Sequence, residues 1–90
     1  MSTIRIPTPL RNYTDGTAIV SLTGNTIREA LGDLIQQYPA LKQHLCQDGR
    51  LRSFVNIYLN QEDIRYLEGI DTIVNENDQL ILVPSIAGGR

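Results

Sequence analysis

The sequence has one cysteine and one histidine, and this scarcity excludes several classes of site. Cys46 alone cannot form an internal disulfide, and together with His44 it falls short of the ligands of a structural zinc site. A ferredoxin-type cluster needs four cysteines. A cysteine nucleophile needs a base within hydrogen-bond reach, and helix positions two apart do not face each other. We therefore expect no bound metal or cofactor and no enzymatic activity.

Long hydrophobic runs and excess positive charge are also missing. No stretch approaches the ~20 apolar residues of a membrane-spanning helix, and the first ten residues do not resemble a signal peptide. A net charge of −2 and a pI of about 5.1 give no electrostatic footprint for nucleic acid or anionic lipid. Arg50 and Arg52 form the basic cluster, which we expect in a solvated loop. These features predict a cytoplasmic protein without nucleic-acid or membrane partners.

What the sequence does contain is enough apolar residues for one small domain. Hydrophobic residues make up 41% of the 90 positions, which suits a globular chain. Two apolar runs predict antiparallel strands at residues 3–10 and 17–22, with a turn at Asp15-Gly16 between them. Pro7 and Pro9 cannot donate to a ladder, so we expect them at an edge or a bulge.

The next segment predicts an amphipathic helix. Thr26 and Glu29 have the spacing of a capping box at its start. Pro39 ends it, because the residue before a proline is pushed out of the helical region. A further short turn is expected around Leu41 and Leu45. Helical spacing places one apolar stripe on the long helix: Ile27, Ala30, Leu31, Leu34, Ile35 and Tyr38.

The second half of the chain predicts strands. Alternation over residues 55–60 puts Val55 and Ile57 on one face and Tyr58 on the other. A polar turn with solvated Glu62 and Asp63 should follow, and then a short returning strand at residues 64–67. Residues 80–83 are apolar without alternation, which favours a central strand covered on both faces.

This order of elements predicts a two-layer α+β domain of the β-grasp, ubiquitin-like type. A mixed sheet of four to five strands would pack on one main helix. We expect the domain to span residues 1–84 and a tail to span residues 85–90. The tail contains Gly88-Gly89, and glycines in a terminal tail do not serve stability.

The stretches "FVNIYLNQEDIR" and "LVPSIAGG" resemble the ubiquitin-like sulfur carriers of the MoaD/ThiS type. Within that family the resemblance is closest to the carrier of O-phosphoserine-dependent cysteine synthases. It implies that an ATP-using enzyme adenylates Gly89, next to Gly88, and that sulfide then forms a thiocarboxylate. The carrier would pass sulfur to a synthase. The same resemblance implies that Val83 contacts the activating enzyme, and with it we expect Tyr58, Ile86 and Ala87 to bind partners.

Arg90 departs from the family pattern, because it locks the carboxylate of Gly89 in a peptide bond. We expect a metal-dependent peptidase of the ubiquitin-tail type to remove it. The alternatives are a residue added by cloning, a longer natural chain, or a protein that is not activated and serves as a binding module. A ubiquitin-like modifier, or a carrier for molybdopterin or thiazole synthesis, is also open. A tail that serves two enzymes in turn favours a monomer.

Overall fold

The computed structural model describes residues 1–47, 50–51 and 55–84. The elements follow one another as β1 (Ser2–Arg5), η1 (Thr8–Tyr13), β2 (Ile19–Leu22), α1 (Ile27–Gln37), η2 (Pro39–Leu41), α2 (Lys42–Leu45), β3 (Cys46–Gln47), β4 (Arg50–Leu51), β5 (Val55–Leu59), β6 (Glu62–Asp63), η3 (Ile64–Tyr66), η4 (Gly69–Asp71) and β7 (Gln79–Pro84). The elements labelled η are 3-10 helices.

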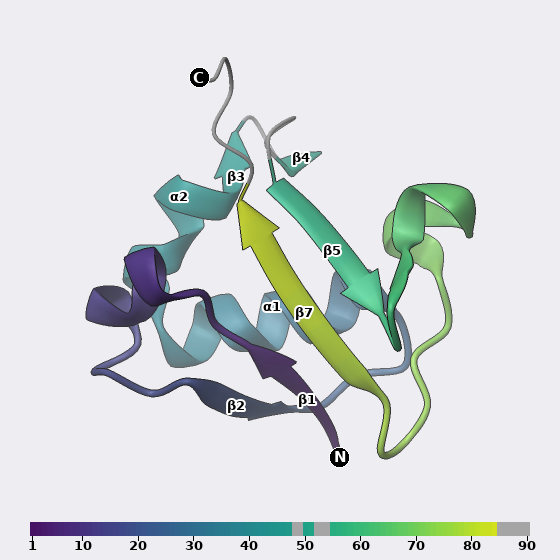
Figure 1. The fold of residues 1–90 in the computed structure, drawn as a ribbon, viewed down its shortest axis with the longest axis horizontal. Coiled ribbons are helices and arrows are strands. Elements are labelled where there is room, and N and C mark those ends of the chain that lie inside the picture. Colours follow the sequence, from purple (N-terminus) through teal and green to yellow (C-terminus); the bar gives the residue numbers. More distant parts are fainter. Residues whose placement is uncertain (48–49, 52–54, 85–90) are drawn as a thin grey trace.

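Five strands form one mixed sheet in the order β2-β1-β7-β5-β6. The pairing of β1 with β7 is parallel and the other pairings are antiparallel. α1 lies across one face of this sheet (Figure 1). The fold is therefore the predicted β-grasp arrangement, a mixed five-stranded sheet packed on one main helix. β3 and β4 form a separate two-stranded pair.

The long helix starts and ends where the sequence predicts. The Thr26 side chain accepts a hydrogen bond from the backbone N–H of Glu29, at 3.2 Å. The Glu29 carboxylate accepts the N–H of Asn25, one residue before the position that a capping box prescribes. The helix stops at Gln37, and Tyr38 before Pro39 has an extended φ of −133°.

The core lies between α1 and the sheet. The first four residues of the predicted helical stripe are buried, and Ile35 and Tyr38 are partly buried. Leu41 and Leu45, predicted to flank a short turn, lie in η2 and α2 and are fully buried. The sheet contributes apolar side chains from β1, β2, β5 and β7: Ile4, Val20, Leu22, Val55, Ile57, Leu80 and Leu82.

Two strand predictions are wrong, one in its extent and the other in the type of element. The strand predicted at residues 3–10 ends at Arg5, and residues 8–13 form η1 instead. Pro7 and Pro9 are the reason, because a proline suits the first turn of a helix and cannot donate to the β1 ladders, which are occupied on both sides. The strand predicted at residues 64–67 is also a 3-10 helix, η3.

Among the described residues, none of the helices is both long and apolar enough to cross a membrane.

Candidate functional site

The sheet face that points away from α1 carries a row of side chains that crosses all five strands. Arg5 lies opposite Ile19 on β2 and opposite Ile81 on β7. Tyr58 lies opposite Ile81 and, on its other side, opposite Asp63. Residues directly opposite each other on neighbouring strands share a face of the sheet. We call this face, with the row Ile19, Arg5, Ile81, Tyr58 and Asp63, the open face.

β7 carries the open face to Pro84, next to the predicted tail at residues 85–90. Val83 is 37% exposed and lies opposite Asn56, whereas its neighbour Leu82 is 1% exposed. The expectation that residues 80–83 are covered on both faces is therefore wrong. The helix α1 covers one face, and no other described helix covers the exposed side chain of Val83. An exposed apolar residue next to the predicted tail is suited to contact a partner.

The predicted site residues fall into two groups, those on the sheet and those in the tail. Tyr58 is half-buried and lies on the face opposite Val55 and Ile57, as the alternation predicts. It therefore shares the open face with Val83, and both roles stay predictions. The residues predicted in the tail, namely Ile86, Ala87, Gly88, Gly89 and Arg90, lie outside the described residues.

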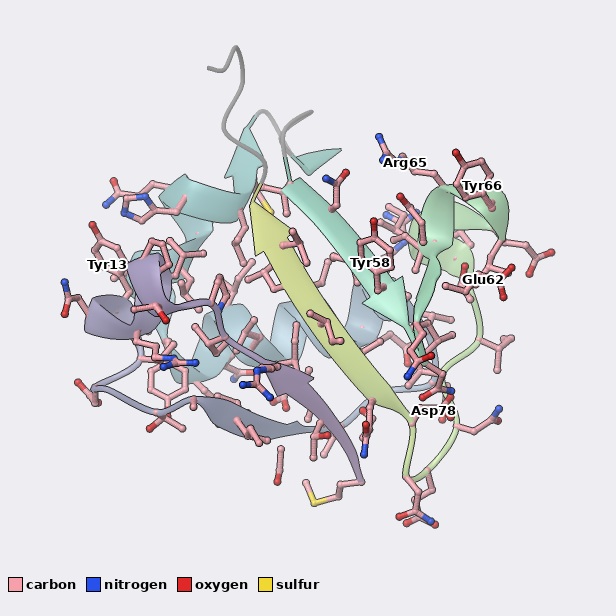
Figure 2. All side chains as sticks on the ribbon, viewed as in Figure 1. Tyr13, Tyr58, Glu62, Arg65, Tyr66 and Asp78 are labelled. Atoms are coloured by element: carbon pink, nitrogen blue, oxygen red, sulfur yellow. The ribbon has the colours of Figure 1, made fainter. Side chains whose placement is uncertain are left out.

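Asp63 is not solvated, which corrects the sequence expectation, although Glu62 is exposed. Only 6% of Asp63 is accessible. Its Oδ1 accepts the backbone N–H of Arg65 at 2.8 Å, and its Oδ2 accepts a hydrogen bond from Nη2 of Arg65, also at 2.8 Å. Figure 2 shows Arg65 and Tyr66 beside this edge of the sheet, with Tyr58 on the neighbouring strand. The carboxylate caps η3, which explains why residues 64–66 form a helical turn.

The ion pair between Asp63 and Arg65 shifts the pKa of both side chains. The side-chain hydrogen bond from Arg65, followed by its backbone N–H, lowers the pKa of Asp63. The same side-chain hydrogen bond raises the pKa of Arg65. Both groups are therefore charged at neutral pH, and the ion pair is fixed at one end of the open-face row. A carboxylate held in its ionised form in this way is unsuited to donate a proton.

His44 and Cys46 lie away from the open face. The His44 ring packs against Tyr13, with 4.1 Å between ring centroids. Its Nε2 is buried and has no hydrogen-bond partner among the described residues. Cys46 is a half-buried free thiol. Within the described ranges, no group of three or more histidine, cysteine, aspartate or glutamate side chains could hold a metal ion.

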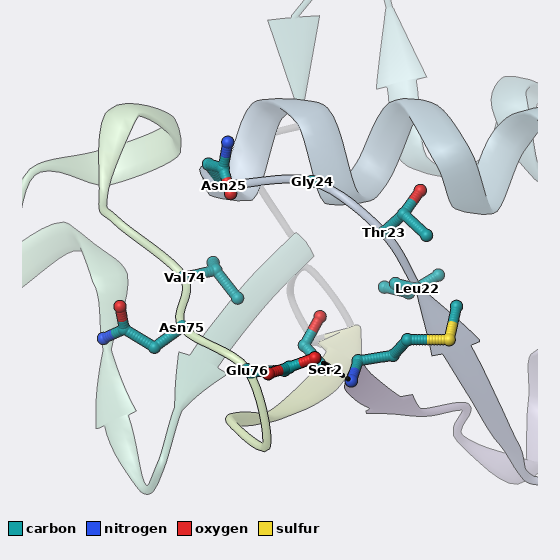
Figure 3. A pocket seen from close by; sticks show the side chains of 9 residues that line it. Ser2, Leu22, Thr23, Gly24, Asn25, Val74, Asn75 and Glu76 are labelled. Carbon is teal, nitrogen blue, oxygen red and sulfur yellow. Dashed lines mark ion pairs between the residues drawn. The ribbon is translucent and has the colours of Figure 1, made fainter.

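A pocket lies at the end of the sheet where β1 and β7 begin (Figure 3). It is lined by Ser2, by residues 22–25 and by residues 74–76, together with Met1. The Met1 amine lies 3.6 Å from Oε2 of Glu76, so the two charges within the pocket offset each other. β7 begins next to this pocket and runs away from it, so the pocket lies at the end of β7 opposite Pro84.

Three open-face residues are missing from the sequence prediction: Arg5, Ile19 and Ile81. The period of two along a strand puts Arg5 on the face opposite Ile4, and Ile81 on the face opposite Leu80 and Leu82. This signal is readable only once the register between strands is known, because register decides which side chains share a face.

Comparison with known proteins places the chain in a family. The model described as "ThiS family" matches residues 4–89. The chain belongs to the ThiS family. The match includes the two glycines of the tail and ends one residue before Arg90.

Individual relatives of this ThiS-family chain support the assignment. The sulfur carrier protein CysO of Mycobacterium tuberculosis is 38% identical over 90 residues, which cover 97% of each chain. A chain in the crystal structure of the Amycolatopsis orientalis BexX/CysO complex superposes with a TM-score of 0.91, at 35% identity, covering 99% of this chain and 100% of that one. The small archaeal modifier protein 1 of Methanosarcina acetivorans superposes with a TM-score of 0.88, at 29% identity, covering 98% and 95% of the two chains.

Proposed function

We propose that this protein is a sulfur carrier, a protein co-substrate that presents a thiocarboxylate on Gly89. The family match through Gly89, together with whole-length similarity to the CysO sulfur carrier, is the observation that supports it. Sulfur transfer in the biosynthesis of cysteine is the pathway that the resemblance favours. The proposed use of ATP by an activating enzyme agrees with the cytoplasmic location expected from the sequence.

The proposed chemistry takes place at the main-chain carboxylate of Gly89. An adenylating enzyme joins this carboxylate to AMP and releases pyrophosphate, because a carboxylate itself is a poor acyl electrophile. Sulfide then attacks the acyl carbon and AMP leaves, which gives the thiocarboxylate. The protein supplies the reacting carboxylate, and no cofactor need be bound to it.

The tail has the length and the composition that this chemistry needs. Five extended residues from position 85 to position 89 reach at most about 17 Å, at roughly 3.3–3.6 Å per residue. Gly88 and Gly89 carry no side chain, so their backbone can pass through a narrow channel and approach a nucleotide closely. Arg90 would place a long cation there, so we propose that a metal-dependent peptidase removes it first.

We propose that the open face docks the activating enzyme. Val83 and Tyr58 lie on it, and Ile86 and Ala87 connect it to the glycines. A CysO carrier is known in complex with another protein, BexX, which supports docking as a property of this kind of domain. A sulfur-accepting synthase would use the same tail in turn, so we propose a monomer that each enzyme releases.

A modifier that forms isopeptide bonds is the second candidate, favoured by the similarity to small archaeal modifier protein 1. One experiment separates the two. Chains ending at Gly89 and at Arg90 are each incubated with the organism's adenylating enzyme, ATP and sulfide, and intact masses are measured. A carrier gains the mass difference between sulfur and oxygen in the Gly89 chain only. A modifier gives conjugates that survive reducing gels, and an unchanged mass in both chains contradicts both functions.

A further inference from the structure

Arg5 stands out on the open face because its charge has no counterpart. It lies on β1, where burial alternates, and its side chain is exposed. Its backbone belongs to the ladders with β2 and β7, but its guanidinium forms no hydrogen bond or ion pair with any residue in the described part of the chain. The described cations that do form side-chain ion pairs are Arg28, with Asp71, and Arg65, with Asp63.

The residues directly opposite Arg5 on both neighbouring strands are apolar. Its two cross-strand neighbours are Ile19, which is 58% exposed, and the partly buried Ile81. Tyr58 lies beyond Ile81 in the same row. Arg5 is thus a cation between two isoleucines, on the face that also carries Val83.

The balance of charge along the row differs from that of the whole protein. The chain has a net charge of −2. The row carries Arg5 and Asp63, and Arg65 reaches into it through its pair with Asp63, so two cations stand against one anion. Since Asp63 is already paired, the excess positive charge is located at Arg5. A partner that covers Ile19 and Ile81 would remove water from this guanidinium, which is costly unless the partner supplies a negative charge.

We propose that Arg5 is a specificity-determining residue that receives a carboxylate of the activating enzyme. This inference rests on the proposed function, and it adds the chemistry of the partner surface: an apolar area with an aspartate or glutamate opposite Arg5. A guanidinium binds a carboxylate through two parallel hydrogen bonds, which fixes the orientation of the docked carrier. The proposed role of Arg5 is in docking, and no chemistry at the carboxylate of Gly89 is assigned to it.

Steady-state adenylation of the chain ending at Gly89 tests the pairing. The organism's adenylating enzyme is assayed by ATP–pyrophosphate exchange with wild type, Arg5→Glu and Arg5→Lys, and with Arg28→Glu as the control. Reversal of a charge that faces a carboxylate should raise KM about ten-fold or more while kcat stays within about two-fold. Arg5→Lys should retain most of the affinity, and Arg28→Glu, on the helix side of the domain, should match wild type. Equal urea midpoints show that each variant is folded.

A cross-linking experiment tests the contact directly. Lys42 is the only lysine, so the Lys42→Arg background leaves the Met1 amine as the remaining native amine. Arg5→Lys and, separately, Arg28→Lys are made in this background. A carbodiimide then joins an amine to a carboxylate in contact, and the resulting amide is mapped by mass spectrometry. We expect a cross-link between position 5 and one acidic residue of the adenylating enzyme, and none from position 28.

The outcomes distinguish the two proposals. Exchange with the same KM for wild type and Arg5→Glu overturns the pairing and leaves the sulfur-carrier function intact. A cross-link from position 28 but none from position 5 overturns the pairing as well. Absence of exchange with the wild-type chain ending at Gly89 overturns the proposed activation, and with it the choice of partner.

Discussion

The guanidinium of Arg65 holds the carboxylate of Asp63 through its Nη2 and Nε atoms, at 2.8 Å and 3.2 Å from Oδ2. The two residues are only two positions apart, and the backbone N–H of Arg65 binds the other carboxylate oxygen. One carboxylate therefore caps η3 and anchors the cation that ends the open-face row. The same carboxylate thus fixes both the backbone of η3 and the position of the Arg65 side chain next to the surface that we propose for docking.

The stability of the domain should depend on the ionisation of Asp63. The pKa of Asp63 is lower in the folded state than in the unfolded chain, so its contribution is complete above the unfolded value of about 3.9. It is lost as the pH falls through the folded value. Asp63→Asn keeps an oxygen for the backbone N–H of Arg65 but removes the charge. We expect a lower urea midpoint than wild type at pH 7, and a difference that shrinks below about pH 4.

Glu62→Gln is the matched control for this measurement, because Glu62 is an exposed carboxylate in the adjacent position. Its urea midpoint should follow wild type at every pH. A difference between Asp63→Asn and wild type that is as large at pH 3 as at pH 7 would show that the ion pair is not its source.

Substitution by alanine should have opposite effects on stability at two glycines, one before α1 and one within it. Gly24 has φ of +128°, and a Cβ there would lie 2.8 Å from Cβ of Glu29 and 2.9 Å from the backbone nitrogen of Ala30. Gly32 lies within α1, and a Cβ there would meet nothing within 4 Å. Gly24→Ala should destabilise the domain by more than ~1 kcal/mol. Gly32→Ala should stabilise it by about 0.5–1 kcal/mol.

Urea titration of both variants at pH 7 measures the two effects. If Gly24→Ala were as stable as wild type, the close approach of the β2–α1 loop to the start of the helix would be wrong. A destabilised Gly32→Ala would mean that position 32 packs against something outside the described residues.

The parts of the fold that follow from local patterns could be predicted from sequence. Thr26, Glu29 and Pro39 define α1 because capping and the restriction before proline act within a few residues. The alternation from Val55 to Leu59 likewise defines β5. The arrangement of these elements agrees with the β-grasp prediction because the number of ways to pack one helix on such strands is small.

Other features depend on interactions that local patterns do not contain. Residues 64–67 have the apolar content of a strand, but the Asp63 carboxylate binds the N–H of Arg65 and turns the chain. The apolar run at residues 80–83 was predicted to be covered on both faces, but Val83 is exposed because α1 covers only one side. Arg5 could not be recognised as a site residue, since its importance comes from its register with Ile19 and Ile81.

The glycine tail should be dispensable for folding and essential for activation. Gly88→Val adds a branched side chain where we propose that the tail threads into the enzyme. We make this substitution in the chain that ends at Gly89 and measure its free energy of unfolding by urea titration. The value should stay within about 0.5 kcal/mol of wild type, as for most changes outside the core. ATP–pyrophosphate exchange should fall to background. Turnover at the wild-type rate would contradict threading, and Ser85→Ala serves as a control in the same segment.

Substitutions at two neighbouring residues of β7 should affect different properties, one the stability of the domain and the other its docking. Leu82 is 1% exposed and belongs to the core, whereas Val83 is 37% exposed on the open face. Leu82→Ala should lower the free energy of unfolding by about 2–5 kcal/mol, through lost burial and the cavity that remains. Val83→Ala should change it by less than about 1 kcal/mol. If Val83 contacts the activating enzyme, its variant should instead raise KM for the carrier about three- to ten-fold at unchanged kcat. An unaltered KM would show that Val83 does not contribute to docking, and would place the docking surface nearer Arg5 and Tyr58.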